Sequence, residues 1–383
     1  MKAKDFMKLN PSFRYIPILR RAFSTIAFIF LVTSFSLSAE TLTFSVVGDV
    51  MCHKAQLDSA YDPKTKTWDF KPWFTEVKPY IELADIAIGN FETTLPGDPK
   101  KYAGYPEFGA PDELAIALKD AGFDILTTAN NHSMDKGKKG VIRTVDVVKE
   151  LGFIHLGTYR SKKEWEENRV LIVERKGIKM AMLNYTYGTN GIAVPPDVVV
   201  NLIHKNKIVE DMALARSMKP DVIIVLYHFG TEYLRFPDKY QKEMVDLALE
   251  EGADIILGGH PHVLQPFTKV ETTDRFGNKK KRLVVYSLGN FVSNQLRRYT
   301  DGGVIFNFQL RKEDGIVHIE KISYIPVYVY KVPGIVQNKF FVIPTEKNLN
   351  NEMKLPEIPY KQMMVFHKDT VDHLKESMEQ VKD

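Results

Sequence analysis

The chain has 383 residues, of which 44 % are apolar, 26 % charged and 11 % aromatic. These values are typical of a globular protein, and they exclude a wholly disordered, collagen-like or polytopic membrane protein. A chain of this length buries roughly 75 % of the surface that it exposes when unfolded, so its stability does not depend on disulfide bonds. Cys52 is the only cysteine, which excludes an intramolecular disulfide.

The formal net charge of +4 is concentrated at one end of the chain. Residues 1–39 contain six basic residues and one acidic residue. Outside this segment, 46 of the 52 Lys and Arg residues and 47 of the 48 Asp and Glu residues remain, which is a net charge of −1. A neutral body of this kind gives no sign of a nucleic-acid partner.

Residues 22–39 form an uncharged run of 18 residues directly after Arg20 and Arg21. A basic start, an apolar centre and small residues before Ala39 are typical of an export signal. As a helix the run would extend about 27 Å, just short of the ~30 Å hydrocarbon core of a bilayer. We therefore expect residues 1–39 to be either a cleaved signal peptide or an N-terminal membrane anchor. The preceding positive charge would then place residues 40–383 outside the cytoplasm, in the periplasm or at the outer surface of the cytoplasmic membrane.

Short apolar runs that end in polar residues alternate with helical patterns in the body of the chain. The runs cover residues 43–47, 84–88, 124–128, 221–226 and 254–257. Runs of this kind are typical of strands buried on both faces, and helical stretches between them, such as 138–151, predict parallel βαβ connections. After residue 264 the pattern changes to hairpins, with turns predicted at 272–278 and 312–315. The last stretch, 358–383, predicts a polar amphipathic helix.

Side chains that can bind metal ions follow the ends of these predicted strands. They are Asp49, Glu92, Asn131, His132, His228, His260 and His262. In open α/β sheets, ligands bind beyond the carboxyl ends of the strands, and carboxylates, amides and imidazoles are typical ligands of Zn, Mn or Fe. We therefore predict a site for one or two divalent transition-metal ions. The imidazoles of His260 and His262 would face the same side if the backbone between them is extended.

The remaining histidines are interpreted as ordinary surface or core residues, because a lone histidine is more often structural than functional. They are His155, His204, His318, His367 and His373.

Six short motifs occur in order between residues 43 and 295. They are residues 48–53 (Gly-Asp-Val-Met-Cys-His), 90–92 (Asn-Phe-Glu), 130–137 (Asn-Asn-His-Ser-Met-Asp-Lys-Gly), 228–233 (His-Phe-Gly-Thr-Glu-Tyr), 259–263 (Gly-His-Pro-His-Val) and 287–291 (Ser-Leu-Gly-Asn-Phe). Together they resemble the CapA-type poly-γ-glutamate capsule synthesis family, a branch of the calcineurin-like metallophosphoesterases. The resemblance implies an α/β fold, a four-layer α/β/β/α sandwich with its site at the sheet edges. We expect residues 40–300 to form this domain and residues 301–383 to complete it with strands and a helix.

The resemblance also implies a two-metal centre. Its metal ligands match Asp49, Asn131, His228, His260 and His262. His132 resembles the imidazole that lies beside the substrate. Two departures matter: Met51 stands where the superfamily has a histidine, with His53 two residues further on, and Glu92 stands where the superfamily has a bridging aspartate. Because a thioether is a poor ligand for a hard divalent metal, one metal position is weak, absent or completed by His53.

Four further residues are candidates for supporting roles. Asp135 either orients His132, which would make it part of the catalytic machinery, or caps the following helix. Asn90, Glu232 and Asn290 are candidates for hydrogen bonds to the metal ligands. The alternatives are that Glu232 is a surface carboxylate and that Asn290 only shapes a turn.

Two classes of function follow from these observations. The first is an exported metal-dependent hydrolase or transferase that acts on a phosphoester, or on the amide bonds of an anionic envelope polymer such as poly-γ-glutamate. The second is a non-catalytic envelope component that binds metal or polymer during capsule assembly or export, together with other capsule synthesis membrane proteins. A secreted nucleotidase is a weaker third hypothesis, because no aromatic pair marks a base-stacking site. Fold alone does not decide between them.

Overall fold

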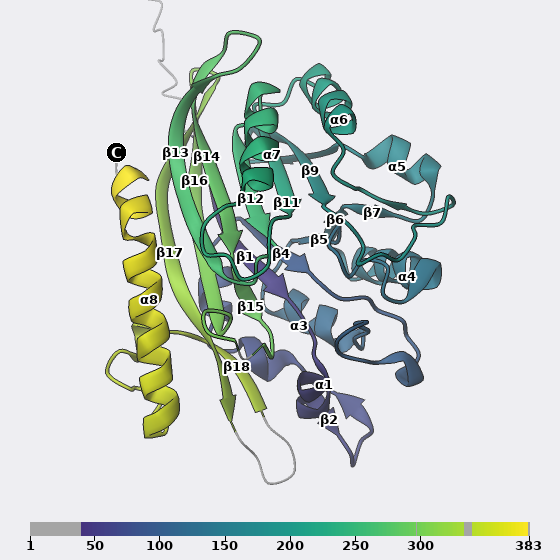
Figure 1. Cartoon of the computed structure of the whole chain (residues 1–383), viewed down its shortest axis with the longest axis vertical. Helices are drawn as coiled ribbons and strands as arrows, with labels where there is room; N and C mark the ends of the chain where they lie inside the picture. Colours follow the sequence, from purple (N-terminus) through teal and green to yellow (C-terminus); the bar gives the residue numbers. More distant parts are fainter. Residues whose placement is uncertain (1–39, 296, 333–338, 382–383) are drawn as a thin grey trace, which may run out of the picture. The chain divides into compact units, whose positions relative to one another are not determined.

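Two large β-sheets form the centre of the computed structural model (Figure 1). The structure describes residues 40–295, 297–332 and 339–381, so the predicted export segment at residues 1–39 lies outside the described residues. Within the described ranges, no helix is both long enough and apolar enough to cross a membrane.

The first sheet has the strand order β18-β17-β16-β1-β4-β5-β6, and β15 pairs with the end of β1. The strands are β1 (Glu40–Val50), β4 (Ile86–Phe91), β5 (Ile125–Thr127), β6 (Ile154–Leu156), β15 (Asn290–Val292), β16 (Gly302–Glu313), β17 (Ile316–Val332) and β18 (Lys339–Pro344). Strands β1, β4, β5 and β6 are parallel, whereas β16, β17 and β18 are antiparallel to their neighbours.

The second sheet has the order β13-β14-β12-β11-β9-β8. Its strands are β8 (Leu171–Arg175), β9 (Ile178–Thr186), β11 (Val222–His228), β12 (Ile255–Gly259), β13 (Leu264–Thr273) and β14 (Lys279–Leu288). The central strands β9, β11, β12 and β14 are parallel, and the edge strands β8 and β13 join them as hairpins. Two small ribbons pair β2 (Tyr61–Asp62) with β3 (Thr67–Trp68), and β7 (Thr158–Tyr159) with β10 (Val199–Val200).

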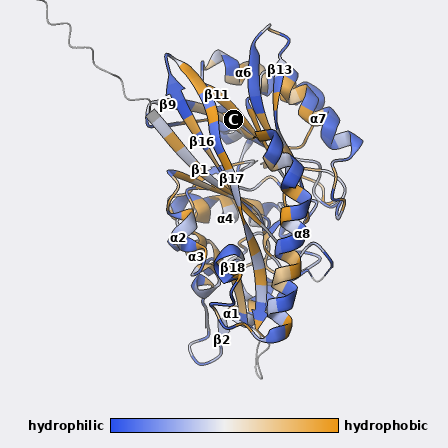
Figure 2. Ribbon diagram, turned by 90° about the vertical axis from the view of Figure 1, so that its left-hand side faces the viewer, coloured by the Kyte–Doolittle hydropathy of each residue, from blue (hydrophilic) through white to orange (hydrophobic). Residues whose placement is uncertain are grey.

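The two sheets pack face to face because their central strands are apolar on both sides. In β1, Val46 belongs to the core between the sheets and Val47 to the core on the outer face of the first sheet. On the other sheet, Leu226 and Leu257 belong to the core between the sheets. Figure 2 shows hydrophobic residues along these strands and mixed colouring along the C-terminal helix. Alternation of period two thus gives each central strand two buried faces.

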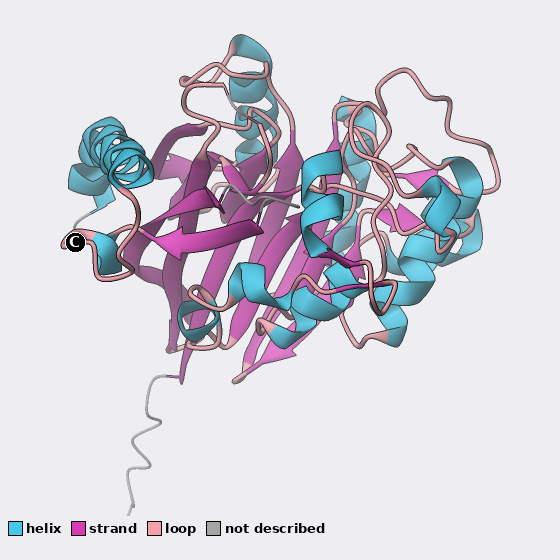
Figure 3. Ribbon diagram, turned by 90° about the horizontal axis from the view of Figure 1, so that it is seen from below, coloured by secondary structure: helices cyan, strands magenta, loops and turns pink. Residues whose placement is uncertain are grey.

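Helices cover the outer faces of both sheets (Figure 3). The first sheet is covered by α1 (Lys54–Ala60), η1 (Lys71–Phe74), α2 (Lys78–Ile81), α3 (Glu113–Asp120) and α4 (Gly137–Glu150), and the second by α6 (Lys205–Ser217) and α7 (Lys239–Glu250). The short helices η2 (Pro99–Lys101), α5 (Lys162–Asn168) and η3 (Glu346–Asn348) lie in connections. This arrangement is the four-layer α/β/β/α sandwich, so the predicted fold class is confirmed.

The C-terminal helix α8 (Glu357–Val381) packs on β13 of the second sheet and on β17 of the first. The five predicted apolar runs are strands β1, β4, β5, β11 and β12. Both predicted turns are present, between β13 and β14 and between β16 and β17. Strands β16, β17 and β18 belong to the same sheet as β1. The division of the chain at residues 39 and 300 stays a prediction.

Candidate metal centre

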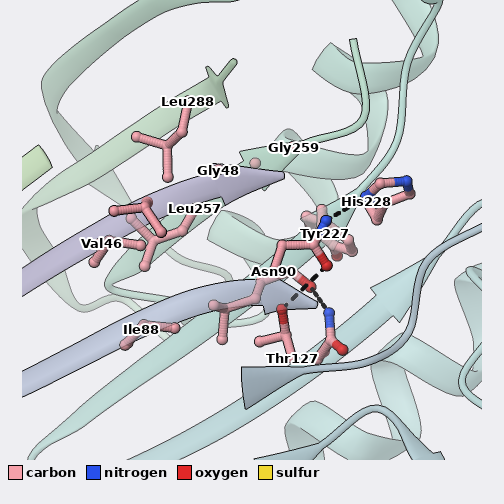
Figure 4. Close-up of a pocket in the computed structure, with 14 residues that line it drawn as sticks. Val46, Gly48, Ile88, Asn90, Thr127, Tyr227, His228, Leu257, Gly259 and Leu288 are labelled. Atoms are coloured by element: carbon pink, nitrogen blue, oxygen red, sulfur yellow. Dashed lines mark hydrogen bonds between the residues drawn. The ribbon is translucent and has the colours of Figure 1, made fainter. Parts of the chain in front are cut away.

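Buried polar side chains converge where the parallel strands of the two sheets end. Asp49 lies in β1, Glu92 directly follows β4, and Asn131 and His132 follow β5. From the second sheet, His228 ends β11, and His260 and His262 follow β12. All seven are buried. Figure 4 shows Asn90 and His228 pointing toward each other, one from each sheet. The seven predicted residues therefore come together, because the carboxyl ends of the strands face the same region.

Asp49 lies at the centre of this group. Its Oδ1 accepts a hydrogen bond from Nδ2 of Asn90 at 2.8 Å, and its Oδ2 lies 3.0 Å from Nδ1 of His262. The backbone N–H of His260 also donates to Oδ2, at 3.4 Å. Burial by itself raises the pKa of Asp49, but the hydrogen bond and the charge of His262 outweigh it, so the pKa is lowered overall. Asp49 is therefore an ionised carboxylate at neutral pH.

The imidazole of His228 faces three polar side chains from the first sheet. Its Nε2 lies 2.7 Å from Oδ1 of Asn131 and 3.5 Å from Oε1 of Glu92. Its Nδ1 lies 3.1 Å from Nδ2 of Asn90, which also reaches Asp49. Asn90 thus holds a strand-end carboxylate and a strand-end imidazole in place, which agrees with its predicted supporting role.

The donor set fits a divalent cation. Both carboxylate oxygens of Glu92 are buried without a hydrogen-bond partner, and so is Nδ1 of His260. A buried carboxylate without hydrogen bonds is costly unless nearby positive charge balances it. Potential ligand atoms lie within 4.8 Å of one another in three overlapping groups. These groups are Glu92–His228–His260, Glu232–His260–His262 and Asp49–Glu92–His262.

Glu92 belongs to two of these groups and thereby connects them. Its Oε1 lies 3.5 Å from Nε2 of His228 and 4.0 Å from Nε2 of His262. Two ligands of one transition metal, each about 2.1 Å from it, are spaced about 3–4 Å apart. The position of Glu92 is thus compatible with a carboxylate shared by two ions. Nitrogen and oxygen donors of this kind suit Zn, Mn or Fe, and they do not distinguish among them.

The pKa values of His260 and His262 are shifted in opposite directions. Burial lowers the pKa of His262, but the charges of Glu92 and Asp49 and the hydrogen bond to Asp49 raise it to about 9. Burial and the neighbouring His228 and His262 hold the pKa of His260 well below its usual range. His260 is therefore neutral at pH 7, whereas His262 carries a proton that a metal ion would have to displace.

The backbone of the His260-Pro261-His262 segment is not extended, so that expectation is wrong. His260 has φ = 97° and His262 has φ = 59°, both in the left-handed region. Such conformations cost about 1–3 kcal/mol each for residues with a Cβ, and they are concentrated at functional sites. The two rings converge because a tight turn reverses the chain, and not because alternate residues of a strand share a face. Their ring centroids are 5.9 Å apart.

Gly259 allows the second sheet to approach the metal centre closely. A Cβ at this position would lie 2.9 Å from Oδ1 of Asp49. At Gly48 the space is tighter still, since a Cβ there would lie 1.9 Å from the carbonyl oxygen of Gly289. These two glycines let β1, β12 and β15 meet around the carboxylate of Asp49.

His132 and Asp135 form a buried pair beside the metal ligands. Nδ1 of His132 lies 2.6 Å from Oδ2 of Asp135, which also accepts the backbone N–H of Phe108 at 2.6 Å. The ring of His132 stands edge-on to the ring of Phe108, 4.4 Å between centroids. Helix α4 has Lys136 at its N-cap and no side-chain capping bond, so Asp135 contacts His132 and does not cap that helix. With Nδ1 on Asp135, Nε2 is the atom left to donate or accept a proton.

His53 and Met51 lie at the edge of the centre. Nδ1 of His53 accepts the backbone N–H of Asn294 at 3.2 Å and lies 3.1 Å from Oε1 of Gln56. Burial lowers the pKa of His53 to about 4. His53 is in none of the three ligand groups found among the described residues. Its predicted role as a substitute ligand stays a prediction. Met51, two residues earlier in the chain, is buried.

The other supporting candidates also contact the site. Asn290 Oδ1 lies 3.1 Å from Nδ1 of His262, so this residue does more than shape a turn. Glu232 is partly buried and belongs to a ligand group with His260 and His262, which places it in the centre and not on a remote surface.

Two residues around the centre were not identified from the sequence. Tyr187 directly follows β9, and its ring lies 4.5 Å from that of His260. Burial, together with the charges of Glu232 and Glu92, raises the pKa of Tyr187 to about 12. Asn130 accepts the backbone N–H of His132 at 3.1 Å. The signal for Tyr187 was present, because β9 is another apolar run that ends in polar residues.

The sequence profile described as "Bacterial capsule synthesis protein PGA_cap" matches residues 43–295. The chain belongs to this family. Among its relatives, the capsule biosynthesis protein CapA of Bacillus anthracis is 30 % identical over 289 residues, which cover 71 % of this chain and 64 % of the relative. The PGA biosynthesis protein CapA of Bacillus subtilis is 27 % identical over 278 residues, which cover 72 % of this chain and 69 % of the relative. The chain thus spans about two thirds of the length of these PGA_cap relatives.

Solved structures are similar only at a distance. The NAD nucleotidase of Haemophilus influenzae has a TM-score of 0.49 and 14 % identity, covering 87 % of this chain and 68 % of that one. The calcineurin-like phosphoesterase YfkN of Bacillus subtilis has a TM-score of 0.44 and 15 % identity, covering 88 % of this chain and 99 % of that one. Similarity this distant does not bear on the activity of the PGA_cap chain.

Proposed function

We propose that this PGA_cap family member is an exported metal-dependent enzyme of capsule or envelope polymer biosynthesis. It hydrolyses or transfers a phosphoester, or an amide bond of an anionic polymer. The observation that carries the proposal is the Glu92 carboxylate, which is buried without a hydrogen-bond partner among three imidazoles and Asp49. A structural role alone does not account for so costly an arrangement.

The roles of the side chains follow from their positions. Asp49, Glu92, Asn131, His228, His260 and His262 would hold one or two divalent ions. A bound divalent ion supplies Lewis-acid polarisation of a phosphoryl or carbonyl oxygen and makes a water molecule more acidic. Asp135 holds the ring of His132 and fixes the proton at Nδ1, so Nε2 can deliver a proton to a leaving oxygen or nitrogen.

Export is part of the proposal and is supported by the basic-apolar pattern of residues 1–39. An extracytoplasmic location would bring the site to the polymer and to other capsule synthesis proteins in the membrane. Subcellular fractionation of cells that produce the tagged full chain tests this part separately. Recovery from the cytoplasm alone would contradict export without affecting the metal site.

The decisive experiment combines metal content, turnover and complementation for the variant His132→Ala. The substrates are model phosphoesters and γ-glutamyl peptides. We expect His132→Ala to keep its metal and to lose about 10²–10⁴-fold in rate, because a positioned acid acts in the transition state. His260→Ala should lose both metal and turnover, whereas the control His204→Ala should lose neither. In a deletion strain, His132→Ala should fail to restore the envelope phenotype. Full restoration by a well-expressed His132→Ala protein would favour the non-catalytic role.

A further inference from the structure

One half of the metal centre has a full set of protein ligands. The group Glu92–His228–His260 contributes one carboxylate and two imidazoles, whose potential ligand atoms lie within 4.8 Å of one another. Oδ1 of Asn131 lies 2.7 Å from Nε2 of His228 and adds a fourth ligand atom. Four nitrogen and oxygen atoms can satisfy a transition-metal ion without any further side chain.

The other half of the centre is one side chain short of this number. The group Asp49–Glu92–His262 supplies three potential ligands. Met51 is buried two residues after Asp49, and its thioether is a poor ligand for a hard divalent ion. His53 accepts a backbone N–H from the loop after β15 and belongs to no ligand group found among the described residues. A fourth protein ligand would therefore have to come from another segment.

Glu232, in the loop after β11, lies close enough to be that ligand. Its carboxylate forms a ligand group with His260 and His262, with potential ligand atoms within 4.8 Å of one another. Within the part of the chain that the structure describes, neither imidazole forms an ion pair within 4.0 Å with this carboxylate. Such a separation is too long for a hydrogen bond. It leaves room for an ion, because two opposite ligands about 2.1 Å from one metal are about 4.2 Å apart.

The backbone of this loop is tied to the turn that carries the two histidines. The N–H of Phe229 donates to the carbonyl oxygen of Gly259 at 3.1 Å, and the N–H of Tyr233 donates to that of Pro261 at 2.8 Å. Between these two bonds, Gly230 has φ = 105°, in the left-handed region that favours glycine. The backbone of the loop thus holds the carboxylate beside the histidines.

A carboxylate from this loop changes the donor chemistry of the incomplete half. Burial lowers the pKa of His262, but the charges of Glu92, Asp49 and Glu232 contribute to raising it, so all three carboxylates act on this ring. With Glu232, this half has three carboxylates and one imidazole, whereas the other half has two imidazoles, an amide and the shared carboxylate. Carboxylates suit Mn²⁺, and imidazoles suit Zn²⁺ or Fe²⁺.

We propose that Glu232 is a metal ligand and completes, with Asp49, Glu92 and His262, a carboxylate-rich position that suits Mn²⁺. This position lies beside the imidazole-rich position, which suits Zn²⁺ or Fe²⁺. The inference rests on the metal centre of the proposed function, and it adds a ligand, a second ion and a metal preference for each position. It does not depend on whether the centre is catalytic.

The test counts the Mn²⁺ ions that the full-length chain binds after a chelator has removed its metal, by calorimetry and elemental analysis. We expect two equivalents for the unmodified chain. Glu232→Gln should bind one ion as before and the other at least about 100-fold more weakly, because even residues that only hold a metal ligand contribute about 10–100-fold to affinity. The control Glu376→Gln removes an exposed carboxylate on α8 and should still bind two ions.

A second substitution in the same background tests the position directly. Met51→His/Glu232→Gln offers an imidazole two residues after Asp49 in place of the lost carboxylate, so it should bind two ions again. The ratio of Zn²⁺ affinity to Mn²⁺ affinity at the restored position should be higher than in the unmodified chain, because an imidazole has replaced a carboxylate. An equal or lower ratio would contradict the metal preference.

Four results would overturn the assignment of Glu232, each measured on protein whose thermal unfolding matches that of the unmodified chain. They are a single ion in the unmodified chain, two ions at unchanged affinity in Glu232→Gln, a single ion in Met51→His/Glu232→Gln, and loss of one ion in His53→Ala but not in Glu232→Gln. A role of Glu232 in proton transfer alone would give the second of these results. Because metal binding is measured without turnover, absence of any catalysis would contradict only the proposed enzyme.

Discussion

Metal binding should release one proton from His262 at neutral pH. The pKa of this imidazole is about 9, because Glu92 and Asp49 stabilise its protonated form against the effect of burial. A metal ligand must be neutral, so the ion has to displace the proton. At pH 7, two units below that pKa, the competition weakens the apparent affinity about 100-fold, or about 3 kcal/mol. Affinity should therefore rise about tenfold per pH unit up to pH 9.

Isothermal titration calorimetry with Zn²⁺ or Mn²⁺, in two buffers of different ionisation enthalpy, counts the released protons. We expect one proton at pH 7 and a value approaching zero above pH 9. His262→Gln should abolish the release and weaken binding. The matched variant His260→Gln should weaken binding but keep the release, because His260 is already neutral. Binding of the unmodified chain without proton release at pH 7 would refute the assignment of His262.

The same shift predicts how the metal-free protein responds to pH. Since the pKa of His262 is raised on folding, its protonated form contributes stability that is fully present below about pH 6.5. That contribution is lost as the pH rises through 9. The melting temperature of metal-free protein should fall over this window, and His262→Gln should reduce the fall. A melting temperature that rises between pH 6.5 and 9 would contradict the shift.

Three substitutions test other parts of the structure. Met51→His should raise metal affinity or stoichiometry in elemental analysis, because it restores an imidazole ligand at this position. The companion His53→Ala tests the substitute-ligand prediction: it should lose metal if His53 is a ligand, and unchanged metal content would contradict that role. Gly259→Ala should weaken metal binding at least about tenfold in the same calorimetry, because its Cβ would lie 2.9 Å from Oδ1 of Asp49. Unchanged affinity would mean that β1 and β12 can move apart to make room for the Cβ. Phe44→Ala, which removes a ring stacked at 4.6 Å on its cross-strand partner between the sheets, should cost about 3–5 kcal/mol in denaturant unfolding. A loss below about 1 kcal/mol would contradict this packing.

The polar ends of the apolar runs were the most informative part of the sequence. A strand buried on both faces has no reason to keep a carboxylate or imidazole at its end unless that end reaches a site. Asp49, His228 and His260 were found in this way, and the structure places them together. Tyr187 was not predicted, because β9 is not among the five apolar runs, although β9 is also an apolar segment that ends in polar residues.

The pairing of side chains within the centre could not be predicted in the same way. Asp135 was equally suited to capping a helix and to holding His132, since both partners are local and the choice depends on the position of Phe108. The turn at His260 and His262 depends on contacts with Asp49, more than 200 residues earlier in the chain. Local backbone preference argued against such a turn, and tertiary contacts outweighed it.

The sequence by itself determined the buried parallel strands and the residue types of the site, because strand burial and strand-end chemistry are local properties of short segments. The four-layer sandwich was implied only by the resemblance to the family. Only the tertiary structure decided that Glu92 is buried without a hydrogen-bond partner between two sheets, and that His262 of the second sheet contacts Asp49 of the first. Those features arise where segments far apart in the chain meet. Burial, charge pairing and cavity volume depend on these tertiary contacts, and no single segment of the sequence determines them.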